Sequence, residues 1–356
     1  MTDIVEITVG DYSKLAHFLA TFPSETRPPG YWRERFRLWW EANPSFSDDW
    51  PRGMGLIDGG DFVGFVGSVP STLQIGSEIV KAANISTWRV HPEHRPRALN
   101  LIREMLRRQE DLIVFATRLG KMSDRLLRRR RTDWGYVPTP TNVRPILAIE
   151  EGGIRAAALS DFLSTAGLAD SPEATRPRLP AERGNSEQAR ACRVTKLSAA
   201  GAEFDTLWHR TKQQYAATNL RTAEMINWYC FASPLFLKSL WACHLDGKLV
   251  GYLISREEQW REMRLCSILD LWFDVQNVWV LDALLGVVVE HASRRKSDLA
   301  ILPPMPHAVA PVVERHGFRH YVKLYDFNYI HIQGPFADRL TKESCFFTDA
   351  QGDNGI

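Results

Sequence analysis

The chain repeats one short pattern in its two halves. Residues 58–67 read DGGDFVGFVG, and residues 245–254 read LDGKLVGYLI. In each stretch a glycine turn is followed by apolar residues that flank Val-Gly-aromatic, which is typical of a β-hairpin. A chain that contains the same hairpin twice is expected to contain the surrounding structural unit twice.

Three further matches occur in the same order along the chain. ANPSF (42–46) corresponds to ASPLF (232–236), TWRV (87–90) to LWFD (271–274), and WGY (134–136) to HGF (316–318). The offset drifts from 190 through 187 and 184 to 182, as expected when short insertions and deletions follow a duplication. Residues 151–190 are rich in Ala, Ser, Pro, Gly and charge, and indicate a linker. The predicted domains are therefore 1–150 and 191–333, with a surface tail at 334–356.

Each half shows one order of elements. A strand and two helices precede the hairpin, and a long strand, helix, strand, helix and closing strand follow it. RPILAIE (144–150) is expected to close the first unit, and YVKLYDFNYI (321–330) the second. The pattern predicts an α/β (α+β) fold with two tandem domains, each a mixed, mostly antiparallel sheet flanked by helices.

The composition excludes several classes of protein. A hydrophobic content of 44% and a charged content of 24% are typical of a globular chain, and a net charge of +2 gives no support to nucleic-acid binding. The five cysteines show no metal-like spacing, so we expect no metal. No signal-peptide pattern and no apolar run of about 20 residues occurs, so we expect a cytoplasmic protein that is not inserted in a membrane. Either a monomer or a homodimer fits the sequence.

Four stretches carry a resemblance to a known family. TWRVHPEHRPRALNLIREML (87–106) is similar to the fourth strand, the V-x-P-x-x-R-x-x-G-x-G/A loop and the following helix of the GNAT (N-acetyltransferase) superfamily. LIVFAT (112–117) resembles its fifth strand, and WGYVP and HGFRHY resemble its glycine-aromatic signature. The paired halves resemble Fem-type and other duplicated acyltransferases. The resemblance implies transfer of an acetyl or other short acyl group from acyl-CoA to the amine of a small-molecule acceptor.

The loop after residue 90 is the expected cofactor site. A helix N-terminus offers free N–H groups to a pyrophosphate, and small residues let the backbone come close. Ala98 and Asn100 stand where the family has its two glycines. The resemblance implies that the cofactor-binding residues are Trp88, Arg89, Val90, Arg95, Pro96, Arg97, Ala98, Leu99 and Asn100. The corresponding loop of the second half, VQNVWV (275–280), has no glycine and no basic residue, so we expect acyl-CoA in the first domain only.

The candidate general bases are His91 and Glu93, which follow the predicted fourth strand. In many family members a tyrosine before the glycine-aromatic pair acts as the acid, but Arg131 and Val313 occupy that position in the two halves. Two alternatives therefore stay open. One is a catalytically inactive binding scaffold. The other is a Fem-type transferase that takes an aminoacyl group from tRNA and contacts RNA through RLLRRRR (125–131).

Overall fold

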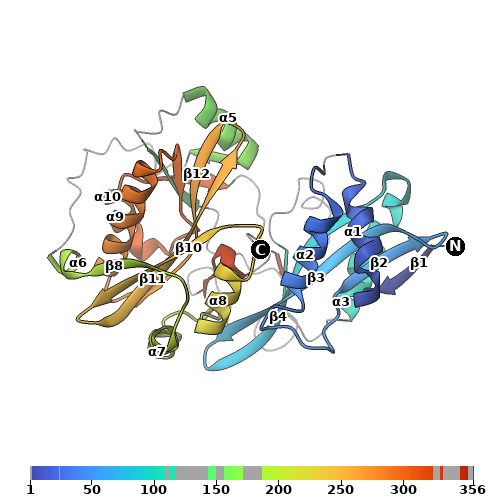
Figure 1. Cartoon of the computed structure of the whole chain (residues 1–356), viewed down its shortest axis with the longest axis horizontal. Coiled ribbons are helices and arrows are strands. Elements are labelled where there is room, and N and C mark those ends of the chain that lie inside the picture. Colours follow the sequence, from blue (N-terminus) through green and yellow to red (C-terminus); the bar gives the residue numbers. More distant parts are fainter. Residues whose placement is uncertain are drawn as a thin grey trace.

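The computed structural model describes residues 2–23, 25–108, 113–116, 143–149, 156–170, 187–323, 329–331, 345–351 and 356. These residues form two eight-stranded sheets that lie beside each other along the long axis of the molecule (Figure 1). Most neighbouring strands are antiparallel, and helices cover both sheets. The predicted fold class is confirmed. None of the helices in these ranges is long and apolar enough to cross a lipid bilayer.

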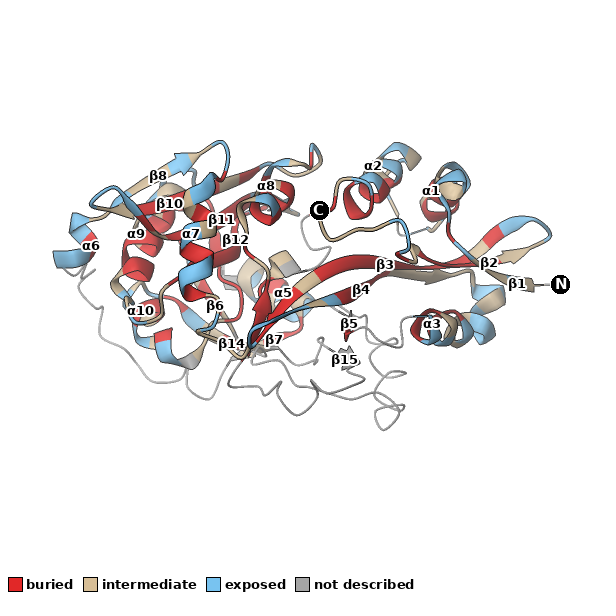
Figure 2. Ribbon diagram, turned by 90° about the horizontal axis from the view of Figure 1, so that it is seen from below, coloured by how far each residue is buried: buried red, intermediate tan, exposed pale blue. Residues whose placement is uncertain are grey.

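The first sheet has the strand order β1-β2-β3-β4-β5-β15, and β4 and β5 are parallel. The short strands β9 and β16 extend it at the end of β3. Helices α1 and α2 cover one face, and α3 covers the other (Figure 2). The bounds are β1 (Thr2–Glu6), η1 (Val9–Asp11), α1 (Tyr12–Ala20), α2 (Pro29–Trp39), β2 (Gly53–Asp58), β3 (Asp61–Ile75), β4 (Glu78–Val90), η2 (Pro92–Arg97), α3 (Ala98–Arg107), β5 (Ile113–Ala116), β9 (Ala217–Asn219), β15 (Tyr329–His331) and β16 (Cys345–Phe346).

The second sheet has the order β7-β14-β6-β13-β12-β11-β10-β8. Helices α7 and α8 pack on one face and α9 and α10 on the other, because successive side chains of β10 and β11 point alternately to the two faces. The bounds are β6 (Val143–Ala148), α5 (Ala156–Ala166), β7 (Leu168–Asp170), α6 (Glu187–Ala191), β8 (Arg193–Leu197), α7 (Ala202–Thr211), α8 (Ala223–Phe231), β10 (Lys238–Leu245), β11 (Lys248–Trp260), β12 (Met263–Phe273), α9 (Trp279–Arg294), β13 (Leu299–Ile301), η4 (His307–Val309), α10 (Ala310–Arg315), β14 (Arg319–Lys323) and η6 (Asp349–Gln351).

The repeated hairpin is built in the same way in both sheets. One additional residue bulges from β3 at Val63 and from β11 at Val250, immediately before the repeated glycine. A Cβ atom on Gly64 would lie 3.2 Å from Leu101 Cδ1 of α3, and one on Gly251 would lie 2.5 Å from Val280 Cγ1 of α9. The glycine therefore lets a helix approach the centre of each sheet.

The closing strands are exchanged between the sheets. β6, predicted to close the first unit, lies between β13 and β14 of the second sheet, and β15 pairs with β5 of the first. The expectation that residues 144–150 close the first sheet is wrong. Of the strand predicted to close the second unit, Tyr321–Lys323 do join the second sheet within β14, whereas Tyr329 and Ile330 join the first. Alternating apolar residues identify a strand, but they do not identify the sheet edge that it joins. The domain limits near residues 150 and 190 stay a prediction.

The predicted tail is also partly buried. Cys345, Phe346 and Phe347 lie in the core, next to Ala217 of β9 and Trp272 of β12. The stretch gave no signal of this because its apolar residues follow no regular spacing, and their partners lie far away in the sequence.

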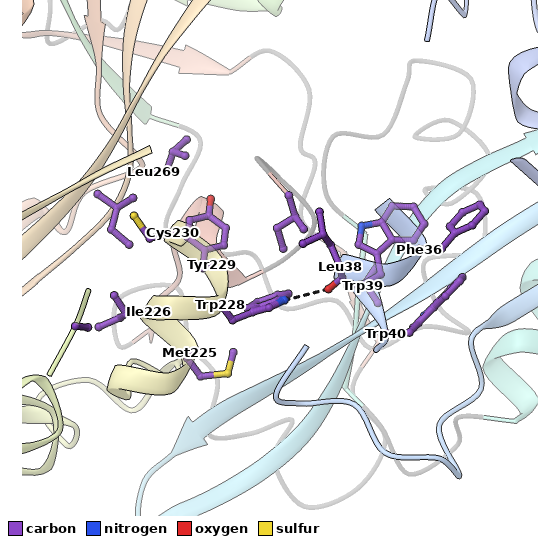
Figure 3. Close-up of a cluster of buried hydrophobic side chains, with 14 of the residues drawn as sticks. Phe36, Leu38, Trp39, Trp40, Met225, Ile226, Trp228, Tyr229, Cys230 and Leu269 are labelled. Carbon is purple, nitrogen blue, oxygen red and sulfur yellow. Dashed lines mark hydrogen bonds between the residues drawn. The ribbon is translucent and has the colours of Figure 1, made fainter. Parts of the chain in front are cut away.

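One apolar cluster joins the two sheets. The repeated segments around residues 39 and 229 face each other, with Trp39 and Trp40 on one side and Trp228 and Tyr229 on the other (Figure 3). The Trp228 Nε1–H donates a hydrogen bond of 3.0 Å to the Leu38 carbonyl oxygen. Buried aromatic area with a satisfied polar atom is typical of a stable interface.

Candidate functional site

Strand β4 has a bulge near the end of its pairing with β3. The register passes from Phe65 opposite Arg89 to Gly67 opposite Ser86, so β4 holds one additional residue here. Thr87 adopts a φ of 54°, in the left-handed region that residues with a Cβ atom rarely enter. The last described pair between β4 and β5 joins Ile85 to Ala116. On β4, this pair lies just before the bulge. A bulge leaves backbone groups outside the ladder, where they can bind a ligand.

The side chains after the bulge divide between the two faces of the sheet. Trp88 and Val90 pack with the cluster under α3, and the buried Trp88 indole N–H has no hydrogen-bond partner among the described residues. Arg89 and His91 lie on the opposite face, against α1 and the segment that follows it. The predicted cofactor residues 88–90 therefore lie on one strand, but the side chain of Arg89 lies on the opposite face of the sheet from those of Trp88 and Val90.

Arg89 is held by a buried carboxylate. Its Nη2 lies 2.9 Å from Oε2 of Glu25, whose side chain is 1% exposed, and its guanidinium lies over the ring of Trp32 at 5.3 Å. Burial alone would raise the pKa of Glu25, but Arg27 and Arg89 lower that pKa to about 2. Glu25 thus shares its single negative charge between Arg27 and Arg89, and its pair with Arg89 fastens the α1–α2 connection to β4. Sequence reasoning missed Glu25 because no local pattern indicates a partner on a distant strand.

The two candidate bases lie in different surroundings. The His91 N–H donates a 2.9 Å hydrogen bond to the Val63 carbonyl oxygen, and the half-buried imidazole stacks on Phe22 at 5.1 Å and meets the edge of Phe18 at 5.3 Å. Glu93 is exposed in the first turn of η2. His91 is therefore held in place at the end of β4, whereas Glu93 faces solvent.

The loop from β4 to α3 presents positive charge. Arg95, Pro96 and Arg97 are exposed, and Arg97 Nη1 donates a weak hydrogen bond of 3.4 Å to the Thr2 carbonyl oxygen. Within the described ranges, Arg95 has no ion-pair partner, and no side chain caps η2 or α3. Ala98 and Leu99 are half-buried and Asn100 is exposed at the start of α3, whose first turn contains no acidic residue. The His94 and Ala98 N–H groups donate to the His91 and Arg95 carbonyl oxygens, so the exposed guanidinium groups are the feature of this loop that suits a phosphate.

The corresponding loop between β12 and α9 is already occupied by its own side chains. The Asp274 carboxylate accepts hydrogen bonds from the Gln276 N–H at 3.0 Å and from Asn277 Nδ2 at 3.2 Å, and Gln214 Oε1 accepts one from the Val275 N–H at 3.1 Å. In the first turn of α9, Asp282 is buried and lies 2.7 Å from His316 Nε2. These contacts disfavour a pyrophosphate here.

Apolar side chains fill the space beside the second loop. Met305, Pro306 and Phe346 pack against Trp272 of β12 and leave no space for a water molecule. Val313, in the expected acid position of this half, is fully buried in α10. Its counterpart Arg131, the basic stretch 125–131 and the WGY motif lie outside the described residues. Where the structure describes the chain, no three His, Cys, Asp or Glu side chains gather to hold a metal ion.

Comparison with known proteins gives a family match and several similar folds. Residues 4–113 match the model of a family described as an acetyltransferase (GNAT) domain. No curated protein matches the chain.

Three solved structures illustrate the likeness in fold. A probable N-acyltransferase from Enterococcus faecalis is 11% identical with a TM-score of 0.59, over 93% of this chain and 72% of that one. A GCN5-related N-acetyltransferase from Kribbella flavida is 15% identical with a TM-score of 0.54, over 86% of this chain and 65% of that one. The Saccharomyces cerevisiae N-myristoyltransferase with bound myristoyl-CoA is 13% identical with a TM-score of 0.54, over 100% of this chain and 84% of that one. At such identities the likeness establishes the fold alone. The chain thus shares its fold with these solved acyltransferases, and its residues 4–113 match the model of a GNAT acetyltransferase domain.

Proposed function

We propose that the protein is an acyl-CoA-dependent N-acyltransferase that moves an acetyl or other short acyl group to the amine of a small-molecule acceptor. The observation that carries the proposal is the β4–η2–α3 unit. A bulged strand leads into a loop with two exposed arginines and with backbone N–H groups that no side chain caps. This unit lies within the residues that match the GNAT domain model.

Each part of the unit has a role in the proposed reaction. Arg95 and Arg97 attract the phosphates, and Pro96, Ala98, Leu99 and Asn100 form the turn and the first residues of α3 against which the pyrophosphate lies. The backbone of Trp88, Arg89 and Val90 borders the thioester, where an N–H group polarises the carbonyl oxygen. Arg89 contributes through its pair with Glu25, which holds the α1–α2 connection beside the strand.

The chemical step needs a base. The amine nitrogen bonds to the carbonyl carbon, the carbon–sulfur bond breaks, and the proton that the amine loses passes through the base to the leaving thiolate. His91 supports this role better than Glu93, because its ring is fixed between Phe18 and Phe22 at the end of β4. A cytoplasmic location and a monomeric or dimeric state are parts of the same proposal.

A binding scaffold without catalysis is the second candidate. It is favoured by Ala98 and Asn100 in place of the family's glycines and by the burial of Val313 in the acid position. No described residue favours the Fem-type reaction.

Calorimetry with acetyl-CoA and free coenzyme A tests the cofactor site. We expect binding to the unaltered protein, and about tenfold weaker binding in Arg95→Ala/Arg97→Ala because two phosphate contacts are lost. Asp274→Asn, in the second loop, is the matched control and should leave the affinity unchanged. Absence of binding at millimolar coenzyme A, or weakening by the control alone, would contradict the proposal. Release of thiol from acetyl-CoA with a panel of amines then separates an enzyme from a scaffold.

A further inference from the structure

A cavity of about 380 Å³ lies against the second sheet, on the face that α5 covers. Its walls come from β6, β11, β12, β13 and α5 and from Asp349 near the end of the chain. This volume is in the range that encloses a small organic molecule. The cavity contains no residue of the β4–η2–α3 unit, so it is a different site.

Most of the cavity wall is apolar. Phe162 of α5 faces Leu265 and Ile301 of the sheet, and its ring meets the edge of Trp260 at 5.3 Å. Leu269, at the bulge of β12, continues this wall. A ligand with an apolar body would be removed from water here.

The guanidinium group of Arg256, in the cavity wall, is buried and only partly hydrogen-bonded. Arg256 of β11 is only 6% exposed, and its Nη2 pairs with Glu258, whose other oxygen accepts a 2.7 Å hydrogen bond from Ser267. The Arg256 Nε–H is buried and has no partner in the described part of the chain. The Nε–H is enclosed by protein, so a ligand in the cavity would instead meet the Nη1 end of the guanidinium, which has no hydrogen-bond partner among the described residues.

The surroundings of Arg256 favour an anion over a cation. Lys238 is its cross-strand neighbour and is 8% exposed. Burial, together with Arg256 and Arg35, lowers the pKa of Lys238 to about 7. Arg144 borders the same cavity, held by Asp349 at 3.0 and 3.2 Å. Glu258 and Asp349, the carboxylates of the cavity wall, are therefore matched by Arg256 and Arg144 and need no bound cation.

We propose that this cavity binds a small organic acid, with its carboxylate on Arg256 and its apolar body against Phe162, Leu269 and Ile301. The carboxylate accepts hydrogen bonds from the guanidinium group of Arg256, and guanidinium–carboxylate hydrogen bonds are strong when buried. Neither Glu258 nor Asp349 has to leave its partner. The proposal is independent of acyl-CoA binding, so each can fail without the other.

Calorimetry on the full chain with matched probes tests this site. The acids are indole-3-acetate, phenylacetate and octanoate, and each is compared with the alcohol of the same skeleton and the amine of the same skeleton. We expect at least one acid to bind about tenfold more tightly than its alcohol, and its amine not to bind. Absence of binding by all three acids at about 10 mM, or equal affinity for acid and alcohol, overturns the proposal.

Three variants locate the binding. Arg256→Gln should lower the affinity for the acid to that for the alcohol, while Arg264→Gln, an exposed arginine of the same hairpin outside the cavity, should change nothing. Ala166→Phe fills the cavity from α5 without removing a charge and should abolish binding of both probes. Acid binding that survives Ala166→Phe overturns the proposal even if Arg256→Gln fails to fold.

Discussion

The loop after β4 and the loop after β12 both connect a bulged strand to a helix, but their side chains differ in charge and in hydrogen bonding. Both come after a bulged strand and lead into a helix under a repeated glycine. In the first loop the described side chains leave the N–H groups uncapped and two arginines are exposed; in the second, Asp274 and Gln214 cap the loop. Asp274 stands where the first copy has Val90. The anion site that we propose in the first loop, and its exclusion from the second, thus depend on a few side chains.

In both copies an ion pair connects the bulged strand to the segment between two helices. In the first copy, Arg89 of β4 pairs with Glu25 between α1 and α2; in the second, Asp270 of β12 pairs with Arg221 between α7 and α8. The positions of the positive and negative groups are reversed. The second pair is the more enclosed, because Tyr252 and Thr348 also donate hydrogen bonds to Asp270 at 2.7 and 2.6 Å.

The largest expected effect comes from breaking the second pair. Asp270→Asn leaves the buried Arg221 without its counter-charge and should lower the free energy of unfolding by about 4 kcal/mol. Denaturation in urea measures this. Asp274→Asn, in the exposed loop nearby, should cost less than about 0.5 kcal/mol. A similar small loss for both variants would show that the pair is not structural.

The repeated glycines should differ in the next largest effect. A Cβ atom at position 251 would lie 2.5 Å from Val280 Cγ1 and 2.9 Å from Phe273 Cβ, whereas at position 64 its nearest neighbours lie at 3.1–3.2 Å. Gly251→Ala should therefore destabilise by about 3 kcal/mol and Gly64→Ala by about 1 kcal/mol. Gly30→Ala, with open space around it in α2, is the control and should not destabilise. Equal losses at positions 64 and 251 would contradict the difference in packing.

Substitution of His91, the candidate base, should lower kcat, whereas substitution of the matching residue in the second copy should not. His91→Gln should lower kcat about 100-fold with little change in the KM for acyl-CoA, since it removes proton transfer and leaves the phosphate contacts in place. Val275→Ala, at the matching position of the second copy, should leave kcat unaltered. If Glu93→Gln has the larger effect, Glu93 is the base.

The smallest expected effect is a pH dependence of the Glu25–Arg89 pair in the first copy. The pKa of Glu25 is lowered from 4.5 to about 2, so its pair contributes stability above pH 4.5 that is lost as the pH falls toward 2. Glu25→Gln should destabilise by about 2 kcal/mol at pH 7 and by much less near pH 2.5. Urea denaturation at the two pH values gives the difference. An equal loss at both would mean that the carboxylate is not held ionised by its arginines.

The sequence predicted those elements that are determined by residues close together in the chain. The hairpins turn where their glycines indicated, and the expected strand, loop and helix from residue 83 to 107 are present. Partners remote in the chain were not predictable. Nothing near Glu25 or Asp270 in the sequence indicates Arg89 or Arg221, and nothing near residue 146 indicates which sheet its strand joins, because tertiary packing selects these partners. The buried Arg256 cavity was missed for the same reason, since its wall gathers segments from residue 144 to residue 349.

The exchange of β6 and β15 has a consequence for the order in which the chain folds during synthesis. The first sheet obtains its edge strand from residues 329–331, and the second obtains an internal strand from residues 143–148. Among the described residues, β5 therefore obtains its second neighbour only after residue 331 has been synthesised. Domain-by-domain folding from the N-terminus is unavailable to such a topology, so the nascent first half must keep an open strand edge shielded from other chains until the last strands arrive.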